Sequence, residues 1–475
     1  MKFSWVAIIV AIGFIVRLLF LFFGAEIYHG KPDFYISGDT HWWVRHFTNL
    51  VEFGIYSGNL ENELGYFGRT PGYSFFIGFF YLITGKNVDL ALQLIPYAQL
   101  ITDTISIWFV YKITEYTFKD KLTSIVASTL YAFYPFIIVW NVVAHAESFS
   151  VFLLFFAIYL FVKAKTNWNF FFVGVMLSLA VLTRIQLILA IPVFGLVILC
   201  QTYNTTKKLF NPKVLLFVLA VVIVYGSWPI RNYVNHDRVL FSQHLGDEGP
   251  WAPDYMKYME YIWSVKVDHN PQMTQIISNA DVVEFPNASY VHAPDSVLLN
   301  RVVSMARTCG VGFSYFARSS HYRKDVVQMG EDCNDEMVEI FDELIMHQKM
   351  YNPLNYYLWV PFGNLKKAIF KSKLYSPSSK MVDILSRLLF TYRTALILLG
   401  IFGLLFLFMK HRELFYSRAI LIGILYVVTW YLFNAFVYRN MEIRFLLHAD
   451  ILLLLPGSFL LAKLISRTGL VKLKE

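Results

Sequence analysis

Long apolar runs, separated by short polar or basic turns, recur along the chain. Most of these runs approach the roughly 20 residues that a helix needs to cross about 30 Å of hydrocarbon. The pattern therefore predicts an all-α membrane protein. Ten spans are expected, at about residues 5–24, 89–117, 122–143, 147–162, 168–189, 190–203, 213–229, 385–409, 418–436 and 446–465.

Lysine and arginine gather in alternate connections between these spans and at both chain ends. Because cytoplasmic loops carry an excess of these residues, both termini are expected in the cytoplasm. Pro192 divides the apolar run 168–203 into one full and one short span. Merging the two would reverse the side of every later segment, but the later lysine clusters favour separate spans.

Two connections on the outward side are much longer than turns. The second of them has more acidic than basic residues, and its aromatic residues cluster as in amphipathic helices at a membrane surface. It is therefore expected to form a small helical domain outside the membrane. The predicted organisation is a transmembrane module over 1–230 with a catalytic outward loop over 25–88, an outward domain over 231–384, and carboxy-terminal spans over 385–475.

Composition supports this interpretation and removes other classes of protein. The 475 residues are 57% hydrophobic and only 16% charged, which leaves too little polar surface for several soluble domains. The net charge of +8 arises from residues that punctuate the spans, so it indicates topology and not a nucleic-acid partner. The sequence contains no Walker loop, GxGxxG or HExxH motif. Of three cysteines, Cys309 and Cys333 could pair if their loop faces an oxidising compartment.

Acidic and histidine side chains at the outward ends of spans are the first candidates for chemistry. Asp39 lies just beyond the first span, and His145 and Glu147 lie at the turn before the fourth. Two carboxylates and an imidazole on one membrane face could act as an acid/base pair or as part of a metal site. The structural alternatives are that Asp39 caps the following helix and that Glu147 stabilises a helix start through the helix dipole.

Arginines on the outward side form a second set of candidates. They are Arg69, Arg184, Arg231, Arg439 and Arg444. Their position opposes the positive-inside trend, and guanidinium groups bind phosphate through planar, bidentate hydrogen bonds. An anionic lipid or phosphate ligand is therefore expected for two or three of them, with the others as anchors to lipid headgroups.

Three ionisable residues, Arg17, Asp103 and Asp450, fall within predicted spans. An ionised side chain there costs several kcal/mol unless it is paired or hydrated. A proton or ion path is one hypothesis. Structural pairing inside the bundle is favoured, because the three positions do not form an evenly spaced relay.

Five short motifs occur in a fixed order at the outward ends of the segments. They are Asp39 followed by Arg69-Thr70-Pro71-Gly72-Tyr73, Tyr134-Pro135 ahead of Glu147, Leu182-Thr183-Arg184, Trp228-Pro229-Ile230-Arg231-Asn232-Tyr233, and Glu442-Ile443-Arg444-Phe445. Together they resemble the motifs of GT-C glycosyltransferases. The resemblance is to the branch that uses polyprenyl-phosphate sugars, which includes the protein O-mannosyltransferases and the lipid A aminoarabinose transferases.

This resemblance implies a GT-C-like bundle and an inverting transferase. The enzyme would take a hexose or pentose from a polyprenyl-phosphate donor and pass it to a glycolipid, glycan or protein at the outer face of the membrane. The bacterial members of the family imply the inner membrane, with the active site facing the periplasm. No cofactor is certain, although a divalent cation is compatible with His145 and Glu147.

The resemblance also assigns roles to individual residues. Asp39 and Glu147 are the expected catalytic carboxylates, and Tyr66 and Arg69 match residues that hold the carrier phosphate in the aminoarabinose branch. The remaining candidates are Arg231 and Arg444 for the phosphate, with His145 and Arg184 as further active-site residues. The first loop reads Gly-Asp-Thr where protein mannosyltransferases have an adjacent Asp-Glu pair, which speaks against a protein acceptor.

Two other functions compete with transfer of a single sugar. A transporter or flippase for a lipid-linked glycan would use the same arginines, but it would be expected to show inverted repeats or paired broken helices, and none is visible in the sequence. A ligase or polymerase of lipid-linked oligosaccharides would use the same membrane face with a different acceptor. Release of free polyprenyl phosphate separates the enzymes from the flippase.

Overall fold

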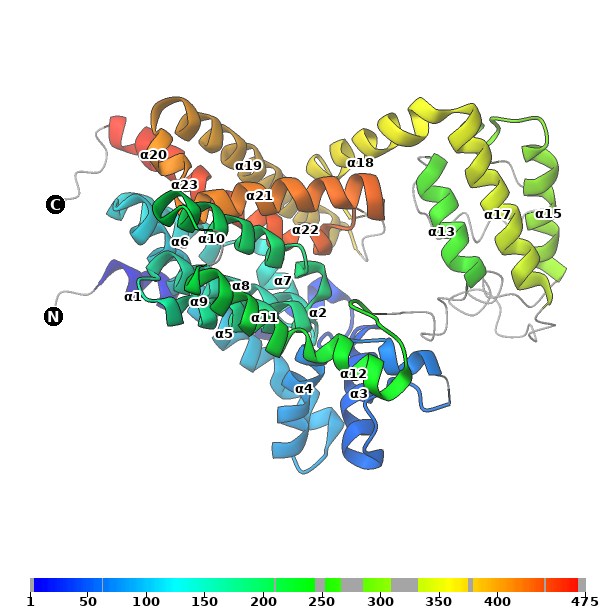
Figure 1. Cartoon of the computed structure of the whole chain (residues 1–475), viewed down its shortest axis with the longest axis horizontal. Coiled ribbons are helices and arrows are strands. Elements are labelled where there is room, and N and C mark those ends of the chain that lie inside the picture. The colour runs from blue at the N-terminus through cyan, green and yellow to red at the C-terminus, as the bar shows by residue number, and fades with distance from the viewer. Residues whose placement is uncertain are drawn as a thin grey trace.

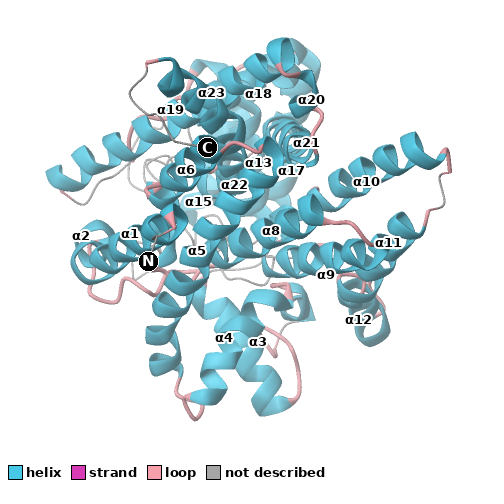
Figure 2. Ribbon diagram, turned by 90° about the vertical axis from the view of Figure 1, so that its left-hand side faces the viewer, coloured by secondary structure: helices cyan, strands magenta, loops and turns pink. Residues whose placement is uncertain are grey.

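The computed structural model describes residues 4–61, 63–208, 211–243, 253–265, 285–308, 332–374, 379–439 and 441–468. Within these ranges all regular secondary structure is helical and no strand occurs (Figure 2). The predicted all-α class is therefore confirmed. Cys309 and the side chain of Cys333 lie outside the described part of the structure, so their pairing stays a prediction.

The helices of the amino-terminal half form one side of the bundle and the long loop that follows the first span. Its helices are α1 (Trp5–Leu19), α2 (Ala25–His29), α3 (Thr40–Phe53), α4 (Pro71–Ile83), α5 (Val88–Phe118), α6 (Lys121–Ala132), α7 (Pro135–Asn141), α8 (Ala146–Lys163), α9 (Asn167–Thr183), α10 (Ala190–Thr206), α11 (Pro212–Val224) and α12 (Ser227–His236).

The remaining helices complete the bundle and build a separate unit beside it. They are α13 (Pro253–Val265), α15 (Asp295–Thr308), α17 (Asp332–Tyr351), α18 (Val360–Ile369), α19 (Lys380–Lys410), α20 (Arg412–Phe415), α21 (Arg418–Leu432), α22 (Ile443–Asp450) and α23 (Leu454–Arg467). The described chain begins and ends on the same side of the bundle, whereas α3, α12 and α13 lie toward the other side (Figure 1).

Each of the ten predicted spans overlaps a helix or a helix pair in the described part of the chain. In the described part of the chain, seven helical segments are long and apolar enough to cross a membrane, and up to nine if two bent pairs each count as one. The bent pairs are α4 with α5, at 118°, and α6 with α7, at 46°. The tenth predicted span corresponds to α9, a shorter apolar helix. These helices make the chain an integral membrane protein.

The loop over 25–88 contains the short helix α2 and two longer helices, α3 and α4, that the sequence pattern had not separated. The amphipathic helix α3 is followed by α4, which begins at Pro71, a residue suited to the first helical turn. A sharp turn at Gly85 and Lys86, both with positive φ, reverses the chain into α5. Helix α4 thus packs back against α3 and α5 and brings Arg69 and Pro71 toward the bundle.

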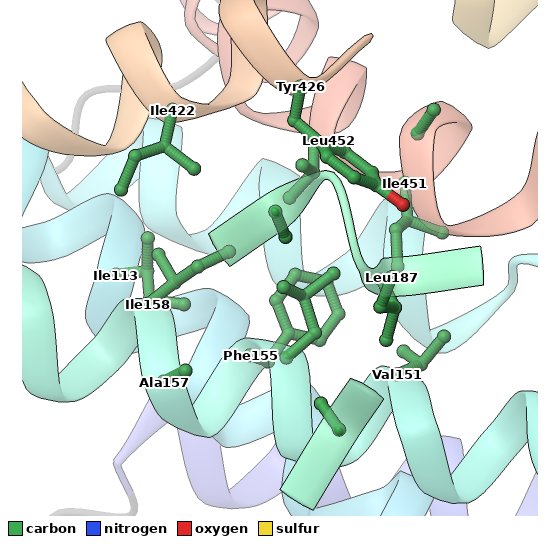
Figure 3. Packing of buried hydrophobic residues seen from close by; sticks show 14 of the residues in the cluster. Ile113, Val151, Phe155, Ala157, Ile158, Leu187, Ile422, Tyr426, Ile451 and Leu452 are labelled. Atoms are coloured by element: carbon green, nitrogen blue, oxygen red, sulfur yellow. The ribbon is translucent and has the colours of Figure 1, made fainter. Parts of the chain in front are cut away.

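Apolar side chains from both halves of the chain form one continuous core. Figure 3 shows Val151 and Phe155 of α8 beside Leu187, with Tyr426 and Ile451 from the carboxy-terminal helices on the other side of the cluster. Because the core joins segments that are far apart in sequence, it fixes the amino-terminal loops against the start of α22. This arrangement places the start of α3, and with it the candidate site, toward the side of the bundle away from the two ends of the described chain.

In the described part of the chain, two arginine–aspartate pairs are buried inside this bundle. Arg17 Nε lies 2.5 Å from Asp103 Oδ2, and Arg393 Nε lies 2.6 Å from Asp450 Oδ2. Structural pairing of Arg17, Asp103 and Asp450 was the favoured prediction, and the structure confirms it. Arg393 is the partner that the sequence pattern did not identify.

Helices α13, α15 and α17 form a unit with its own hydrophobic core, called here the three-helix unit. Its buried residues include Tyr261, Val302, Phe341 and Leu344. In Figure 1 the unit stands apart from the main bundle, to which α18 leads back. It therefore corresponds to the small outward helical part that the sequence predicted.

Candidate active site

Asp39, at the start of α3, is held in place by backbone contacts of its own loop. Thr40 Oγ1 donates a hydrogen bond of 3.0 Å to the carbonyl of Ala144, and the Ala144 N–H donates one of 2.8 Å to the carbonyl of Tyr35. These bonds fasten residues 35–40 to the turn before α8. Although Asp39 precedes α3, its side chain makes no capping hydrogen bond, so the capping alternative is wrong.

Three cationic or titratable groups surround the Asp39 carboxylate. Arg444 Nη1 lies 2.9 Å from Oδ2, Arg69 Nη2 lies 3.3 Å from Oδ1, and His145 Nε2 lies 3.6 Å from Oδ2. The Nε atom of Arg444 also contacts Glu442, at 2.6 Å. Residues that are up to 405 positions apart in the sequence therefore meet at one carboxylate.

A second, deeper layer continues from His145. Its Nδ1 lies 3.0 Å from Glu147 Oε2, and the other oxygen of Glu147 lies 2.9 Å from Arg184 Nη1. The imidazole packs edge-on against Trp43 and is close to Trp140, with ring centroids 5.0 and 5.4 Å away. His145 therefore connects a buried carboxylate to an accessible one.

Exposure distinguishes the two layers. The side chains of Asp39 and Arg444 are 30% and 27% exposed, whereas that of Glu147 is 0% exposed. A ligand approaching from the outward side thus meets Asp39 and Arg444 first. Burial disfavours the charged form of Asp39, but the guanidinium groups of Arg444 and Arg69 outweigh it and hold the pKa of that carboxyl below its ordinary value.

Arg184 retains unused hydrogen-bonding capacity. Its Nε and Nη2 atoms are buried and have no hydrogen-bond partner among the residues that the structure describes. Unpaired buried donors are costly, so such a group is suited to bind an anion. The spare donors lie on the arginine that already neutralises Glu147.

The residues of the Pro71-Gly72-Tyr73 motif position this site rather than face it. Tyr73 OH donates to Gln99 Oε1 at 2.8 Å, and Gln99 Nε2 donates to the carbonyls of Asn141 and Val143 at 2.8 and 2.7 Å. This chain of bonds fixes the segment that leads to His145. A Cβ atom at Gly72 would come within 2.5 Å of the Thr183 backbone nitrogen, so only glycine allows α4 to approach the end of α9.

Arg231 and Tyr66 form a second group beside the first. The guanidinium of Arg231 donates to the carbonyls of Tyr66 and Tyr56, at 2.8 and 2.7 Å, and Tyr66 stacks on His236 with centroids 4.1 Å apart. They line a cavity of about 580 Å³, called here the aromatic cavity, whose walls also include the rings of Tyr56, Phe75 and Trp228. Tyr56 links the cavity to the first group, because its hydroxyl donates to the Arg69 carbonyl at 3.1 Å.

The structure thus brings together six of the eight sequence-predicted site residues and places two nearby. The six are Asp39, Arg69, His145, Glu147, Arg184 and Arg444, while Tyr66 and Arg231 lie at the cavity. Arg439, a further outward arginine, instead stacks over Tyr356 at 3.7 Å. The catalytic and phosphate-binding roles of these residues stay predictions.

Sequence reasoning missed several supporting residues. Gln99 and Ser150 lie within apolar helices, and Ser150 Oγ lies 2.8 Å from His448 Nε2 in the buried region behind Glu147. A polar side chain in a predicted span was the available signal, but it does not identify a partner. Glu442 belongs to the same sequence motif as Arg444, and their closeness in sequence was the available signal for this pair.

The candidate active site does not fit a metal ion. Asp39 and Glu147 lie on opposite edges of the His145 ring instead of around one point, and each is already paired with arginine. Among the described residues, a compact group of three metal-ligating side chains occurs elsewhere, at His292, Asp295 and His347. A divalent cation is therefore compatible with the chain, but the donor geometry favours the three-helix unit.

Comparisons with known proteins agree with this architecture. Residues 68–228, less than half of the chain, match the model of the dolichyl-phosphate-mannose-protein mannosyltransferase family. The fold is similar to that of the archaeal oligosaccharyltransferase AglB from Archaeoglobus fulgidus, solved with an inhibitory peptide and a dolichol-phosphate, at 12% identity and a TM-score of 0.51. The apo form of the Archaeoglobus fulgidus oligosaccharyltransferase gives the same values.

Both matches cover 99% of this chain but only 52% of the archaeal protein, so the chain spans about half the length of these structures. No curated protein matches it in sequence. The fold and the family match define an integral membrane protein of the GT-C glycosyltransferase fold class. The resemblance that the sequence motifs indicated is therefore confirmed.

Proposed function

We propose that this chain is a membrane glycosyltransferase that moves a sugar from a polyprenyl-phosphate donor to a hydroxyl-bearing acceptor. The observation that carries the proposal is the accessible Asp39 carboxylate held between Arg69 and Arg444, with His145 behind it. A base and several cations at one outward opening are what displacement of a lipid phosphate requires.

In the proposed reaction, Asp39 accepts the proton of the acceptor hydroxyl as its oxygen attacks the anomeric carbon of the sugar. The bond from that carbon to the phosphate oxygen breaks, and polyprenyl phosphate leaves with the electron pair. Attack from the side opposite to the leaving group inverts the anomeric centre. Arg69 and Arg444 stabilise the charge that develops on the phosphate, and the spare donors of Arg184 add to this stabilisation.

His145 and Glu147 extend this chemistry into the protein. A neutral His145 that donates from Nδ1 to Glu147 presents its Nε2 lone pair toward Asp39. It can then receive the proton that Asp39 takes from the acceptor. Glu147 and Arg184 neutralise each other, so the imidazole is oriented without adding net charge to the interior.

We place the isoprenoid part of the donor in the aromatic cavity beside Tyr66 and Arg231. The cavity is bounded by Tyr56, which is bonded to the Arg69 backbone, so a chain lying there would hold its phosphate near the arginines. The acceptor, a glycolipid, glycan or protein, would enter from the exposed side of Asp39. The family resemblance supports a bacterial inner membrane, with this opening on the periplasmic face and both termini in the cytoplasm.

The test is transfer from radiolabelled short-chain polyprenyl-phosphate hexoses and pentoses to membrane extract by the purified full-length protein. Asp39→Asn is expected to lower the release of polyprenyl phosphate by about 10² to 10⁴-fold, the usual contribution of a general base. Arg69→Ala should also lose activity. Arg45→Ala is the matched control, because Arg45 is exposed on α3 and stacks on Trp42.

One outcome would contradict the site assignment, and another would contradict the function. Equal activity of wild type and both variants would remove Asp39 and Arg69 from the site. If no donor is consumed but intact donor crosses the bilayer of vesicles that contain the protein, the chain is a flippase for lipid-linked glycans.

A further inference from the structure

The three-helix unit contains a cluster of two histidines and an aspartate that the transferase reaction does not use. Asp295 is the first residue of α15, His292 lies three residues before it, and His347 lies near the end of α17. One ligand atom from each lies within 4.8 Å of the others. The side chains of Asp295 and His347 are almost fully buried.

The carboxylate of Asp295 is already oriented for a ligand. Its Oδ2 accepts hydrogen bonds of 2.8 Å from the N–H groups of Val291 and His292, which fixes the plane of the carboxylate. Its other oxygen lies 2.6 Å from His347 Nδ1. On the far side of the His347 ring, Nε2 lies 3.7 Å from Glu343 Oε1.

His292 has a buried ring nitrogen that no hydrogen bond among the described residues accounts for. Its ring stacks on Tyr351 at 4.3 Å and 6°, and its centroid lies 4.7 Å from that of His347. The Nδ1 atom of this fixed ring is buried and has no hydrogen-bond partner among the described residues. A buried imidazole nitrogen without a partner, beside a second imidazole and a carboxylate, is suited to a metal ligand.

We propose that His292, Asp295 and His347 bind a divalent transition-metal ion, with zinc as the ion that this ligand set fits best. Two neutral imidazoles and one carboxylate are preferred zinc ligands, and tetrahedral coordination would bring the ligand atoms to roughly 3.3 Å from one another. The Asp295–His347 contact of 2.6 Å would therefore lengthen on metal binding, while the widest spacing in the group, at most 4.8 Å, would shorten. Glu343 would orient His347 from behind, as carboxylates commonly do for metal-bound histidines.

This site would hold the three-helix unit together independently of the transfer reaction. The ligands join the first residues of α15 to the last turns of α17, which otherwise meet through the apolar core. Metal binding is thus expected to stabilise the unit, because the ion binds the folded arrangement and not the unfolded chain.

The experiment measures the zinc content of the full-length protein after chelator treatment and dialysis against buffered zinc. His292→Phe removes the ligand nitrogen but keeps an aromatic ring to stack on Tyr351, so the fold should survive. Wild type should retain about one equivalent more zinc than this variant, and zinc should raise the thermal unfolding midpoint of wild type only. Cobalt in place of zinc should give wild type the visible absorption of a tetrahedral site.

Two matched controls locate the ion. His41→Phe changes an exposed histidine, and Asp39→Asn changes the candidate active site, so both should keep the zinc. Equal zinc content in wild type and His292→Phe would overturn the proposal, as would a wild type that binds none. Loss of zinc in Asp39→Asn alone would move the metal to the candidate active site and also overturn it.

Discussion

Carboxylates are paired with arginines both inside the bundle and at its outward opening, but their surroundings differ. Inside, the Arg17–Asp103 and Arg393–Asp450 pairs are separated by 2.5 and 2.6 Å and are at most 1% exposed. At the opening, Asp39 and Arg444 are separated by 2.9 Å and are about a third exposed. The distances alone would not reveal which pair can meet a ligand.

The inner carboxylates have their hydrogen-bonding capacity filled by the protein. Asp103 also accepts bonds from Tyr131 OH and Asn141 Nδ2, and Asp450 also accepts one from Tyr431 OH. These networks compensate the cost of burying charge and leave no place for a substrate. At the opening, the side chains of Asp39 and Arg444 are 30% and 27% exposed, so exposure, and not the presence of an ion pair, distinguishes the candidate site.

The strongest way to break an inner pair is Arg393→Leu. The substitution leaves Asp450 buried without its counter-charge, so the free energy of unfolding should fall by about 3 to 5 kcal/mol. Thermal unfolding in detergent measures the loss. Arg393→Leu combined with Asp450→Leu should recover part of the stability, because no buried charge remains. A double variant less stable than the single one would contradict the structural role of this pair.

At the opening, Arg444→Gln should affect catalysis more than stability. Loss of one preorganised cation is expected to lower kcat/KM for the donor by about 10² to 10³-fold. Because Arg444 helps to lower the pKa of the Asp39 carboxyl, its removal raises that pKa, and the acid limb of the pH profile should shift to higher pH. Arg45→Ala again serves as control. An unchanged acid limb would show that Asp39 is not the titrating base.

His46 lies outside the spans on α3, the helix that follows Asp39, and allows the pH dependence of stability to be tested there. Burial lowers the pKa of its imidazole to about 4. Between the ordinary value near 6.5 and that lowered value, the unfolded chain binds a proton that the folded chain does not, so stability falls as pH falls. At pH 5 the loss is about 2 kcal/mol relative to pH 7.5.

Replacement of His46 by phenylalanine should reduce this pH dependence. Thermal unfolding midpoints at the two pH values provide the comparison. If wild type and His46→Phe lose equal stability on acidification, the destabilising proton binds elsewhere.

The smallest expected effect concerns the aromatic cavity. Ser227→Trp adds a ring at its wall and should raise the donor KM several-fold with little change in kcat, because filling the cavity impairs binding of the lipid and not the chemical step. Val222→Trp, on a lipid-facing surface of α11, is the matched control. A fall in kcat without a change in KM would place the isoprenoid chain elsewhere.

The sequence motifs identified most of the residues at the opening because each motif lies at the end of an apolar span. Asp39, Arg69, Glu147 and Arg444 could therefore be assigned to one membrane face before their distances were known. Their pairing could not be predicted, since Asp39 and Arg444 are joined across 405 positions by the packing of α22 against the amino-terminal helices. The same limit explains why Arg393 was missed as the partner of Asp450.

The local sequence also did not determine the bounds of α4 or which side chains meet in the three-helix unit. The apolar run that became α4 was included in the outward loop, because its sharp turn into α5 depends on two positive-φ residues, Gly85 and Lys86. In the three-helix unit, His292 and Asp295 are only three positions apart, yet His347 joins them from another helix. Neither the turn angle nor this cluster has a strong signature in sequence.

By itself, the sequence determined that this chain is helical, resides in a membrane and carries its candidate chemistry on one face. These properties follow from the length of apolar runs, the distribution of lysine and arginine, and the position of polar motifs, all of which are local. Only the tertiary structure decided which charges are neutralised inside the bundle and which remain open to a ligand. That decision depends on burial and on hydrogen-bond partners brought together by packing between distant helices.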